Sequence, residues 1–202
     1  MYALISASKK GDLDTVRHIV KDGKVNVDFQ DLDGHTALQW ASYCGHSEVV
    51  RYLMEVGKAN AGIKDNEGKT ALSYASMYGH LEIIHYLVES GKVNVDLQDN
   101  DGKTVLHEAS IHHRVNAVRY LVWVGKANVN IKDKHGCTPL MHASKDGYIE
   151  LVRYFVESGK ANVDLQNSHG KTALDMASEF ARTCRCCSAH DDVIRFLRMP
   201  AL

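Results

Sequence analysis

A 34-residue period constrains the fold of this chain more than any other feature. A threonine recurs at Thr36, Thr70, Thr104, Thr138 and Thr172, and a glycine precedes each of them by two positions. A leucine follows each threonine by two positions, and an Ala-Ser pair follows by five. Self-similarity in a single register over five copies is the signature of a repeat architecture.

Each period predicts a turn, a short first helix, a loop and a second helix. The Asp-x-x-Gly segment is typical of a turn, and the threonine after it caps a helix, a contribution of about 1 kcal/mol. The first helix, for example 37–44, is rich in small residues that let neighbouring helices approach closely. The second helix is amphipathic, as Val49, Val50, Leu53 and Met54 show.

A helix pair of this kind buries its apolar side only against its neighbours, so the copies must stack in a row. The period therefore predicts an all-α solenoid of six antiparallel helix pairs joined by β-hairpin-like turns, forming one domain over 1–202. The expected parts are an N-terminal capping pair (1–30), full repeats (31–64, 65–98, 99–132 and 133–166) and a C-terminal capping repeat (167–202) with an inserted cysteine-rich loop near 180–189.

These units resemble the ankyrin repeat over essentially the whole chain. The Thr-Pro-Leu-His motif of that family corresponds to Thr138-Pro139-Leu140-Met141 and to Thr104-Val105-Leu106-His107, and its Gly-His pair corresponds to Gly45-His46 and Gly79-His80. The resemblance implies a non-catalytic stack that binds another protein or a peptide. In this family partners usually dock on the concave side, which is built from turn tips and first helices.

Positions that change from repeat to repeat on that side are the candidate partner-binding residues. Tryptophan and tyrosine contribute most to binding energy at interfaces, and the second and third pairs carry several. Filling gaps between adjacent first helices is an equally good interpretation of Trp40 and Tyr74. The full set comprises Trp40, Tyr43, Tyr74, Met77, Tyr78, Glu108, Ile111, His112, His142 and Lys145 on the first helices, and His35, Lys69, Asp101, Lys103 and His135 at the turn tips.

One second helix departs from its siblings. Trp123 occupies the position of Glu55, Glu89 and Glu157, where an exposed side chain is expected. We therefore predict that Trp123 is exposed to solvent. A second contact site there is the less favoured alternative, because isolated exposed apolar residues are normal.

Charge and composition narrow the choice of partner. Lys+Arg 24 against Asp+Glu 25 gives a net charge of −1, whereas phosphate-binding proteins carry a concentrated basic excess. We expect neither a nucleic-acid nor a membrane partner, and a chain that is monomeric by itself and needs no cofactor. The five cysteines are an odd number, which does not suggest a disulfide framework. The expected compartment is the cytoplasm or the nucleus.

Two clusters invite a chemical interpretation. Cys137, His142 and Asp146 share one repeat, but all three positions vary between repeats and no enzyme motif is present. We therefore predict that the chain is not an enzyme.

The second cluster is Cys184, Cys186 and Cys187 with His190 nearby, the only weak candidates for a metal site. Zinc sites usually draw on two separated ligand pairs, and His190 is already in register with His46. The favoured function is thus a protein–protein interaction module, acting as adaptor, scaffold or inhibitor. The alternative is a metal- or redox-responsive regulator acting through the cysteine loop.

Overall fold

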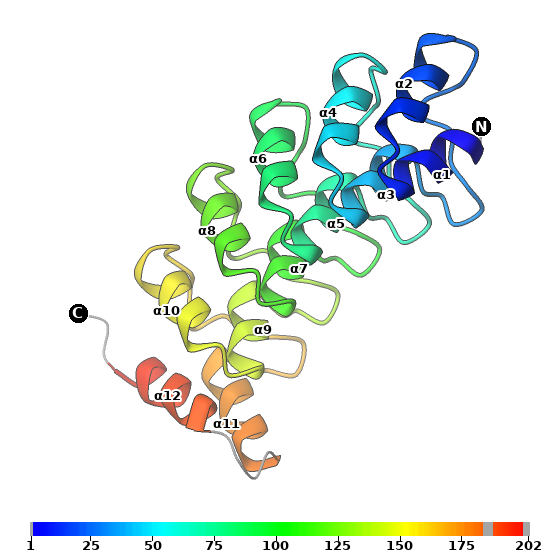
Figure 1. Cartoon of the computed structure of the whole chain (residues 1–202). Coiled ribbons are helices and arrows are strands. Elements are labelled where there is room, and N and C mark those ends of the chain that lie inside the picture. The colour runs from blue at the N-terminus through cyan, green and yellow to red at the C-terminus, as the bar shows by residue number, and fades with distance from the viewer. Residues whose placement is uncertain (1, 184–187, 200–202) are drawn as a thin grey trace.

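The computed structural model describes residues 2–183 and 188–199, and these form six antiparallel helix pairs (Figure 1). The first helices of the pairs are α1 (Tyr2–Lys10), α3 (Ala37–Cys44), α5 (Ala71–Tyr78), α7 (Val105–Ile111), α9 (Pro139–Lys145) and α11 (Ala173–Thr183). The second helices are α2 (Leu13–Lys21), α4 (Ser47–Glu55), α6 (Leu81–Glu89), α8 (Val115–Trp123), α10 (Ile149–Glu157) and α12 (Ser188–Leu197). The predicted all-α stack of six pairs is confirmed.

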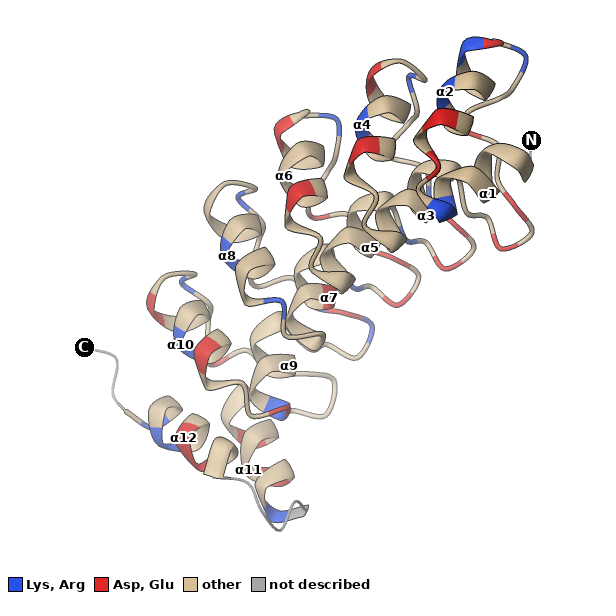
Figure 2. Cartoon of the chain, in the orientation of Figure 1, with Lys and Arg blue, Asp and Glu red and all other residues tan. Residues whose placement is uncertain are grey.

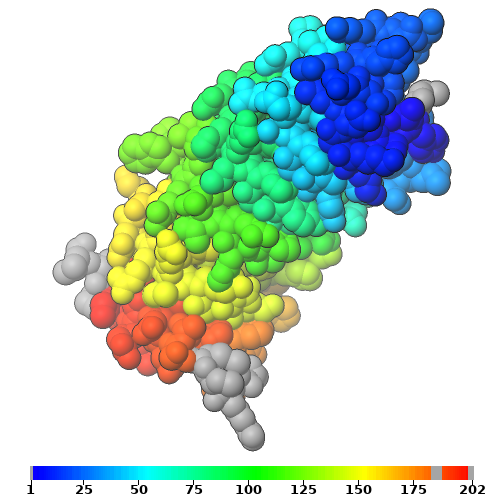
Figure 3. All heavy atoms as spheres, in the orientation of Figure 1, coloured from blue at the N-terminus to red at the C-terminus, as the bar shows by residue number. Residues whose placement is uncertain are grey.

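The helices form two parallel rows, with the first helices in one row and the second helices in the other (Figure 1). The core lies between the rows and runs the length of the stack, which is elongated in the space-filling view (Figure 3). Leu72 and Leu106 from first helices and Ile84 and Val118 from second helices are almost fully buried there. Each helix contacts its own partner and the adjacent pairs, so no pair has a separate core.

The turns between pairs project beyond the first helices, and we call residues 31–35, 65–69, 99–103, 133–137 and 167–171 the fingers. Each finger is closed like a hairpin: the backbone N–H of Asp31, for example, donates to the carbonyl of His35 at 3.0 Å. Adjacent fingers are joined by one backbone hydrogen bond each, such as Asn66 N–H to Asp33 O at 3.1 Å. The fingers therefore form a continuous row with a fixed spacing.

Polar side chains at the third position of two first helices tie the helix to the next finger. In α7, Nδ1 of His107 accepts from the backbone N–H of Thr104, and Nε2 lies 3.1 Å from the carbonyl oxygen of Cys137 in the following finger. Gln39 in α3 accepts from Thr36 N–H and donates to Lys69 O at 2.8 Å. These groups are buried but hydrogen-bonded, so their burial is tolerated.

The last pair differs from the others. Ala181 stands in the column of Gly45 and Gly79, both left-handed helix ends, so no glycine stops the helix there. Helix α11 continues to Thr183, and α12 begins at Ser188. Both helices therefore extend into the range 180–189, where the sequence predicts a loop. Cys184, Cys186 and Cys187 lie outside the described residues.

Among the described residues, no helix has both the length and the apolar character needed to cross a membrane.

Truncating a core leucine tests the stacking. Leu106 is fully buried between the helix rows, whereas Leu32 at a finger tip is 88% exposed. We expect Leu106→Ala to lower the free energy of unfolding by about 2–5 kcal/mol through lost burial and a residual cavity. The matched Leu32→Ala should change it by less than about 0.5 kcal/mol. Urea unfolding followed by circular dichroism measures both, and equal losses would contradict the packing described.

Candidate functional site

The fingers and the first helices form one continuous surface, which we call the finger face. It is the surface that the ankyrin resemblance predicts to be concave. Fourteen of the fifteen predicted partner-binding residues lie on its fingers or first helices, and His112 follows directly after α7 as its C-cap residue. Acidic segments follow the fingers from the N-terminal end to α7 (Figure 2).

One aspartate at the start of each of the first four fingers organises this face: Asp31, Asp65, Asp99 and Asp133, which we call the turn aspartates. Oδ1 of Asp65 accepts from the backbone N–H groups of Glu67 and Lys69 at 2.9 and 3.0 Å, and Oδ1 of the other three accepts in the same way. Oδ1 thus fixes the finger. The second oxygen, Oδ2, is left for a side chain on the first helix.

Three repeats supply a donor to that second oxygen from the residue nine positions later. The indole N–H of Trp40 donates to Asp31 Oδ2 at 2.8 Å, and the hydroxyl of Tyr74 donates to Asp65 Oδ2 at 2.6 Å. In the fifth pair His142 Nε2 lies 2.8 Å from Asp133 Oδ2. The sequence left open whether Trp40 and Tyr74 contact a partner or fill gaps between adjacent first helices. Tyr74 is 6% exposed, which fits gap filling, while Trp40 is half-buried.

A cluster of five rings covers the N-terminal half of the finger face, and we call it the aromatic cluster: His35, Trp40, Tyr43, Tyr74 and Tyr78. Ring centroids lie 4.5 Å apart for Tyr43 and Tyr78, and 5.5 Å apart for Trp40 and Tyr43. A hydrogen bond with Tyr43 and partial burial raise the pKa of Tyr78 to about 12. Tyr43 and Tyr78 keep more than a third of their surface exposed, so they are the members that a partner can reach.

The middle of the finger face breaks the donor pattern. Glu108 of α7 stands where the siblings carry Trp40, Tyr74 and His142, and it is only 3% exposed. The sequence placed Glu108 on an open face, so its burial is a correction. Its register in the first helix is the one from which Trp40, Tyr74 and His142 donate to their turn aspartates. We call this position the socket.

The pKa of Glu108 reflects the burial of its carboxyl group. Burial raises the pKa of its carboxyl group above the ordinary value, while the charges of Lys69 and Lys103 lower it and that of Asp99 raises it further. His112 Nε2 is 3.6 Å from Glu108 Oε2. Burial also lowers the pKa of His112, so the imidazole is neutral near pH 7 and does not compensate the carboxylate.

The remaining predicted residues are reachable to different degrees. Met77, Ile111, Lys145, Lys69, Lys103 and Asp101 are half-buried, while His112 and His135 are exposed. Ile111 ends a first helix that is in contact with both neighbouring first helices. The finger lysines are paired: Lys69 with Glu67 at 2.7 Å, and Lys103 with Asp101 at 3.7 Å.

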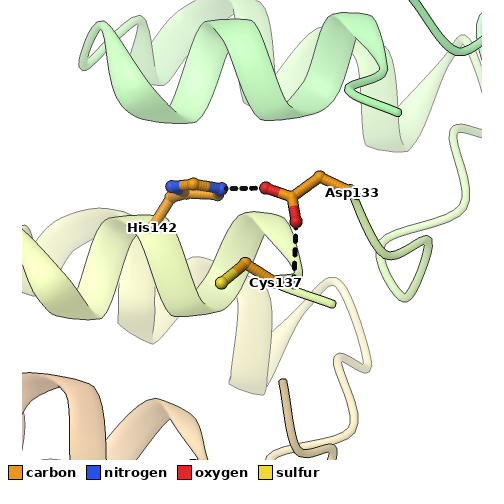
Figure 4. A group of neighbouring side chains, drawn as sticks. All are labelled: Asp133, Cys137 and His142. Atoms are coloured by element: carbon orange, nitrogen blue, oxygen red, sulfur yellow. Dashed lines mark hydrogen bonds and ion pairs between the residues drawn. The ribbon is translucent and has the colours of Figure 1, made fainter. Parts of the chain in front are cut away.

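The C-terminal half of the finger face contains a group with metal-ligating atoms: Asp133, Cys137 and His142 (Figure 4). One atom of each lies within 4.8 Å of the others. A hollow of about 450 Å³ opens beside them, between the fingers of the fifth and sixth repeats. Cysteine, histidine and aspartate are all zinc ligands, so the geometry needs an explanation.

The repeat supplies that explanation. Asp133 uses Oδ1 for the backbone N–H groups of His135 and Cys137 and Oδ2 for His142, which is the arrangement that Asp65 has with a tyrosine. Burial by itself would raise the pKa of Asp133, but the bonds from His142 and Cys137 N–H lower it to about 2. Burial also raises the pKa of the Cys137 thiol, which keeps it protonated and a poor ligand or nucleophile near pH 7. The acid partner of His142 is thus Asp133, and Asp146 is exposed.

His190, the fourth member of the predicted metal set, has a structural role. Its Nε2 is 2.8 Å from the carbonyl oxygen of Lys145, and the residue is buried. His46 and His80 contact Lys9 O and Tyr43 O in the same way, both at 3.1 Å. The register of the repeats therefore accounts for His190.

The opposite side of the stack carries an exposed tryptophan. Trp123 on α8 is 74% exposed, which confirms the sequence prediction. In the earlier repeats the tyrosine hydroxyl donates to the preceding glutamate, as Tyr120 does to Glu89 at 3.1 Å. Trp123 interrupts that row, and Tyr154 donates to the carbonyl of Arg119 instead.

Comparison with known proteins agrees with this architecture. Family models for ankyrin repeats match residues 1–60 and 56–133 (three copies) and residues 125–177 (many copies). The chain belongs to the ankyrin repeat family. This repeat fold is generally that of a non-catalytic binding module. Among curated protein sequences no relative matches it.

A solved structure resembles the chain over almost its full length. It is the complex of the predatory endopeptidase Bd0816 from Bdellovibrio bacteriovorus with the immunity protein Bd3460, and the similarity is to the ankyrin-like immunity protein. The identity is 26%, the TM-score is 0.82, and the match covers 96% of this ankyrin chain and 98% of the other.

Replacing Glu108 by glutamine tests the buried carboxylate. A raised folded-state pKa means that the wild type is most stable below the unfolded-state pKa and loses stability as the pH rises through the folded-state value. We expect Glu108→Gln to raise the melting temperature at pH 7, with a gain that shrinks towards about pH 4. Thermal unfolding at both pH values measures the gain.

Glu67→Gln is the matched control. A hydrogen bond from Lys69 lowers the pKa of Glu67, so its neutralisation should not stabilise the fold. A lower melting temperature for Glu108→Gln than for the wild type at pH 7 would contradict the cost assigned to Glu108.

Proposed function

We propose that this ankyrin chain is a non-catalytic module that binds a folded protein partner through its finger face. The observation that carries the proposal is the aromatic cluster. Tyr43 and Tyr78 are exposed, yet the ring of Tyr43 packs on Trp40 and Tyr74, which are held by the turn aspartates, and the ring of Tyr78 packs on Tyr43. Anchored rings lose little conformational entropy on binding, so they are suited to be the centre of an interface.

The finger face also has the extent that a specific interface requires. It is continuous from the first to the last pair because adjacent fingers are linked by hydrogen bonds. A standard protein interface buries about 800 Å² on each partner. Several consecutive repeats can provide such an area, and their different side chains can set specificity.

Among the roles of adaptor, scaffold and inhibitor, we favour the inhibitor. The support is the resemblance to an immunity protein that was solved in complex with an endopeptidase. Coverage of both chains is nearly complete, so the likeness concerns the whole stack and not one repeat. We propose an enzyme as the partner, blocked by a stack that covers its surface.

The metal- or redox-responsive alternative receives no support from the residues that the structure describes. His190 is committed to a backbone contact, and the three cysteines of that hypothesis lie outside the described residues.

The proposal is tested by comparing a variant of the finger face with a variant of the opposite face. Tyr43→Ser/Tyr78→Ser removes the exposed rings of the aromatic cluster, whereas Trp123→Glu changes the opposite face to the glutamate of the sibling repeats. A partner is captured from a lysate of the source organism, identified by mass spectrometry, purified and measured by isothermal titration calorimetry. We expect the double variant to weaken binding at least about tenfold, and Trp123→Glu to leave it unchanged.

Circular dichroism and thermal unfolding must show that both variants remain folded. Loss of binding in Trp123→Glu together with retention in the tyrosine double variant would place the interface on the second helices, against the proposal. If the captured partner is an enzyme, its turnover with and without the chain decides between inhibitor and adaptor.

A further inference from the structure

Asp99 is the turn aspartate of the described chain for which the residue nine positions later, Glu108, is an acceptor and not a donor; we call these two residues the Asp99–Glu108 pair. Oδ1 of Asp99 accepts from Asp101 N–H and Lys103 N–H at 2.9 and 2.8 Å, as in the other repeats. Within the part of the chain that the structure describes, Oδ2 of Asp99 accepts no hydrogen bond. Asp99 is also half-exposed, whereas Asp65 and Asp133 are buried.

Glu108 also accepts no hydrogen bond within the described residues. Its side chain is 4% exposed, and its ion-pair contact is His112 Nε2, 3.6 Å from Oε2. A carboxylate that is largely buried and accepts no hydrogen bond from the protein costs free energy. The siblings at this position show that an indole, phenol or imidazole fits the socket, so neither space nor backbone requires a glutamate.

The neighbouring cations are already engaged with other acids. Lys69 pairs with Glu67 at 2.7 Å, while Lys103 and Lys134 both pair with Asp101. The charges of Lys69 and Lys103 also act on Glu108, but within the described residues neither lysine forms an ion pair with Asp99 or Glu108. Glu108 on α7 and Tyr78 of the aromatic cluster on α5 lie on adjacent helices that are in contact.

We propose that the Asp99–Glu108 pair is a binding site for a guanidinium group, namely an arginine side chain inserted by the protein partner. A guanidinium has N–H donors on two edges of one plane. One edge can donate to Asp99 Oδ2, in the place of the missing sibling donor, and another to the Glu108 carboxylate. The inference rests on the proposed function, because it names the side chain that the partner contributes.

Other cations fit the pair less well. A lysine ammonium is a point charge that does not match two acceptors on separate elements in one plane. Calcium takes about six to eight oxygen ligands, whereas Oδ1 of Asp99 is already occupied by two backbone N–H groups. An arginine satisfies both carboxylates without displacing a bond of the finger.

The test uses small probes, so it does not depend on the partner. The full ¹⁵N-labelled chain is titrated with N-acetyl-arginine amide and, separately, with N-acetyl-citrulline amide, which has the same shape without the charge. We expect saturable shifts of backbone amide signals in 99–103 and 108–112 with the arginine probe, and binding at least about tenfold weaker with the citrulline probe. Calcium chloride alone should give no saturable shift at these amides.

Two variants complete the experiment. Glu108→Gln should abolish the shifts caused by the arginine probe, although its melting temperature is higher than that of the wild type, so that unfolding does not explain the loss. Asp33→Asn removes the same charge from an exposed finger position and should leave the titration unchanged.

Absence of a saturable shift with the arginine probe, equal binding of the citrulline probe, or retention of binding by Glu108→Gln would each overturn the site. So would saturation by calcium alone. None of these results bears on the aromatic cluster, whose test uses the purified partner, and failure of the two proposals is therefore distinguishable.

Discussion

The carboxylate of the turn aspartate is the contact on which both the stacking and the surface chemistry of this chain depend. Its Oδ1 accepts two backbone N–H groups and sets the shape of the finger, as at Asp65. A finger of fixed shape can bond to the next finger, and a row of such fingers sets the spacing of the first helices. The second oxygen is then presented to the first helix, where each repeat must satisfy it or leave it open.

This arrangement couples stability to recognition at a single position. Trp40 and Tyr74 satisfy the carboxylate and are thereby immobilised, so they serve as a base against which the exposed Tyr43 packs, and Tyr78 packs on Tyr43 in turn. Glu108 leaves the oxygen open and adds a second buried acceptor. An acceptor without a donor lowers the stability of the free protein, and a ligand that supplies the donor removes this cost, which adds to its binding affinity. Such a trade-off between stability and binding is common at functional sites.

The repeat period was sufficient to predict the helices, their pairing and the exposure of Trp123, because all of these follow from register and amphipathicity. It could not predict the burial of Glu108. Register places residue 108 on the finger side of its helix, but only the structure shows that its side chain is buried there. The extension of α11 was readable in principle, since Ala181 stands in the glycine column. The partner of His142 was missed because Asp133 is nine residues away, beyond one helix turn.

The three chemistries of the finger face also follow from this single rule. From the N-terminus onwards, the residue nine positions after the turn aspartate is Trp40, Tyr74, Glu108 and His142, which gives an aromatic half, an acidic middle and an imidazole–thiol end. Because the fingers are joined by hydrogen bonds, these zones keep a fixed order and separation. A partner that matches one zone but presents the wrong group to the next leaves a buried acceptor unpaired, which costs more than a missing contact. Discrimination among partners can therefore arise from the sequence of zones along the stack, without any deep pocket in a single repeat.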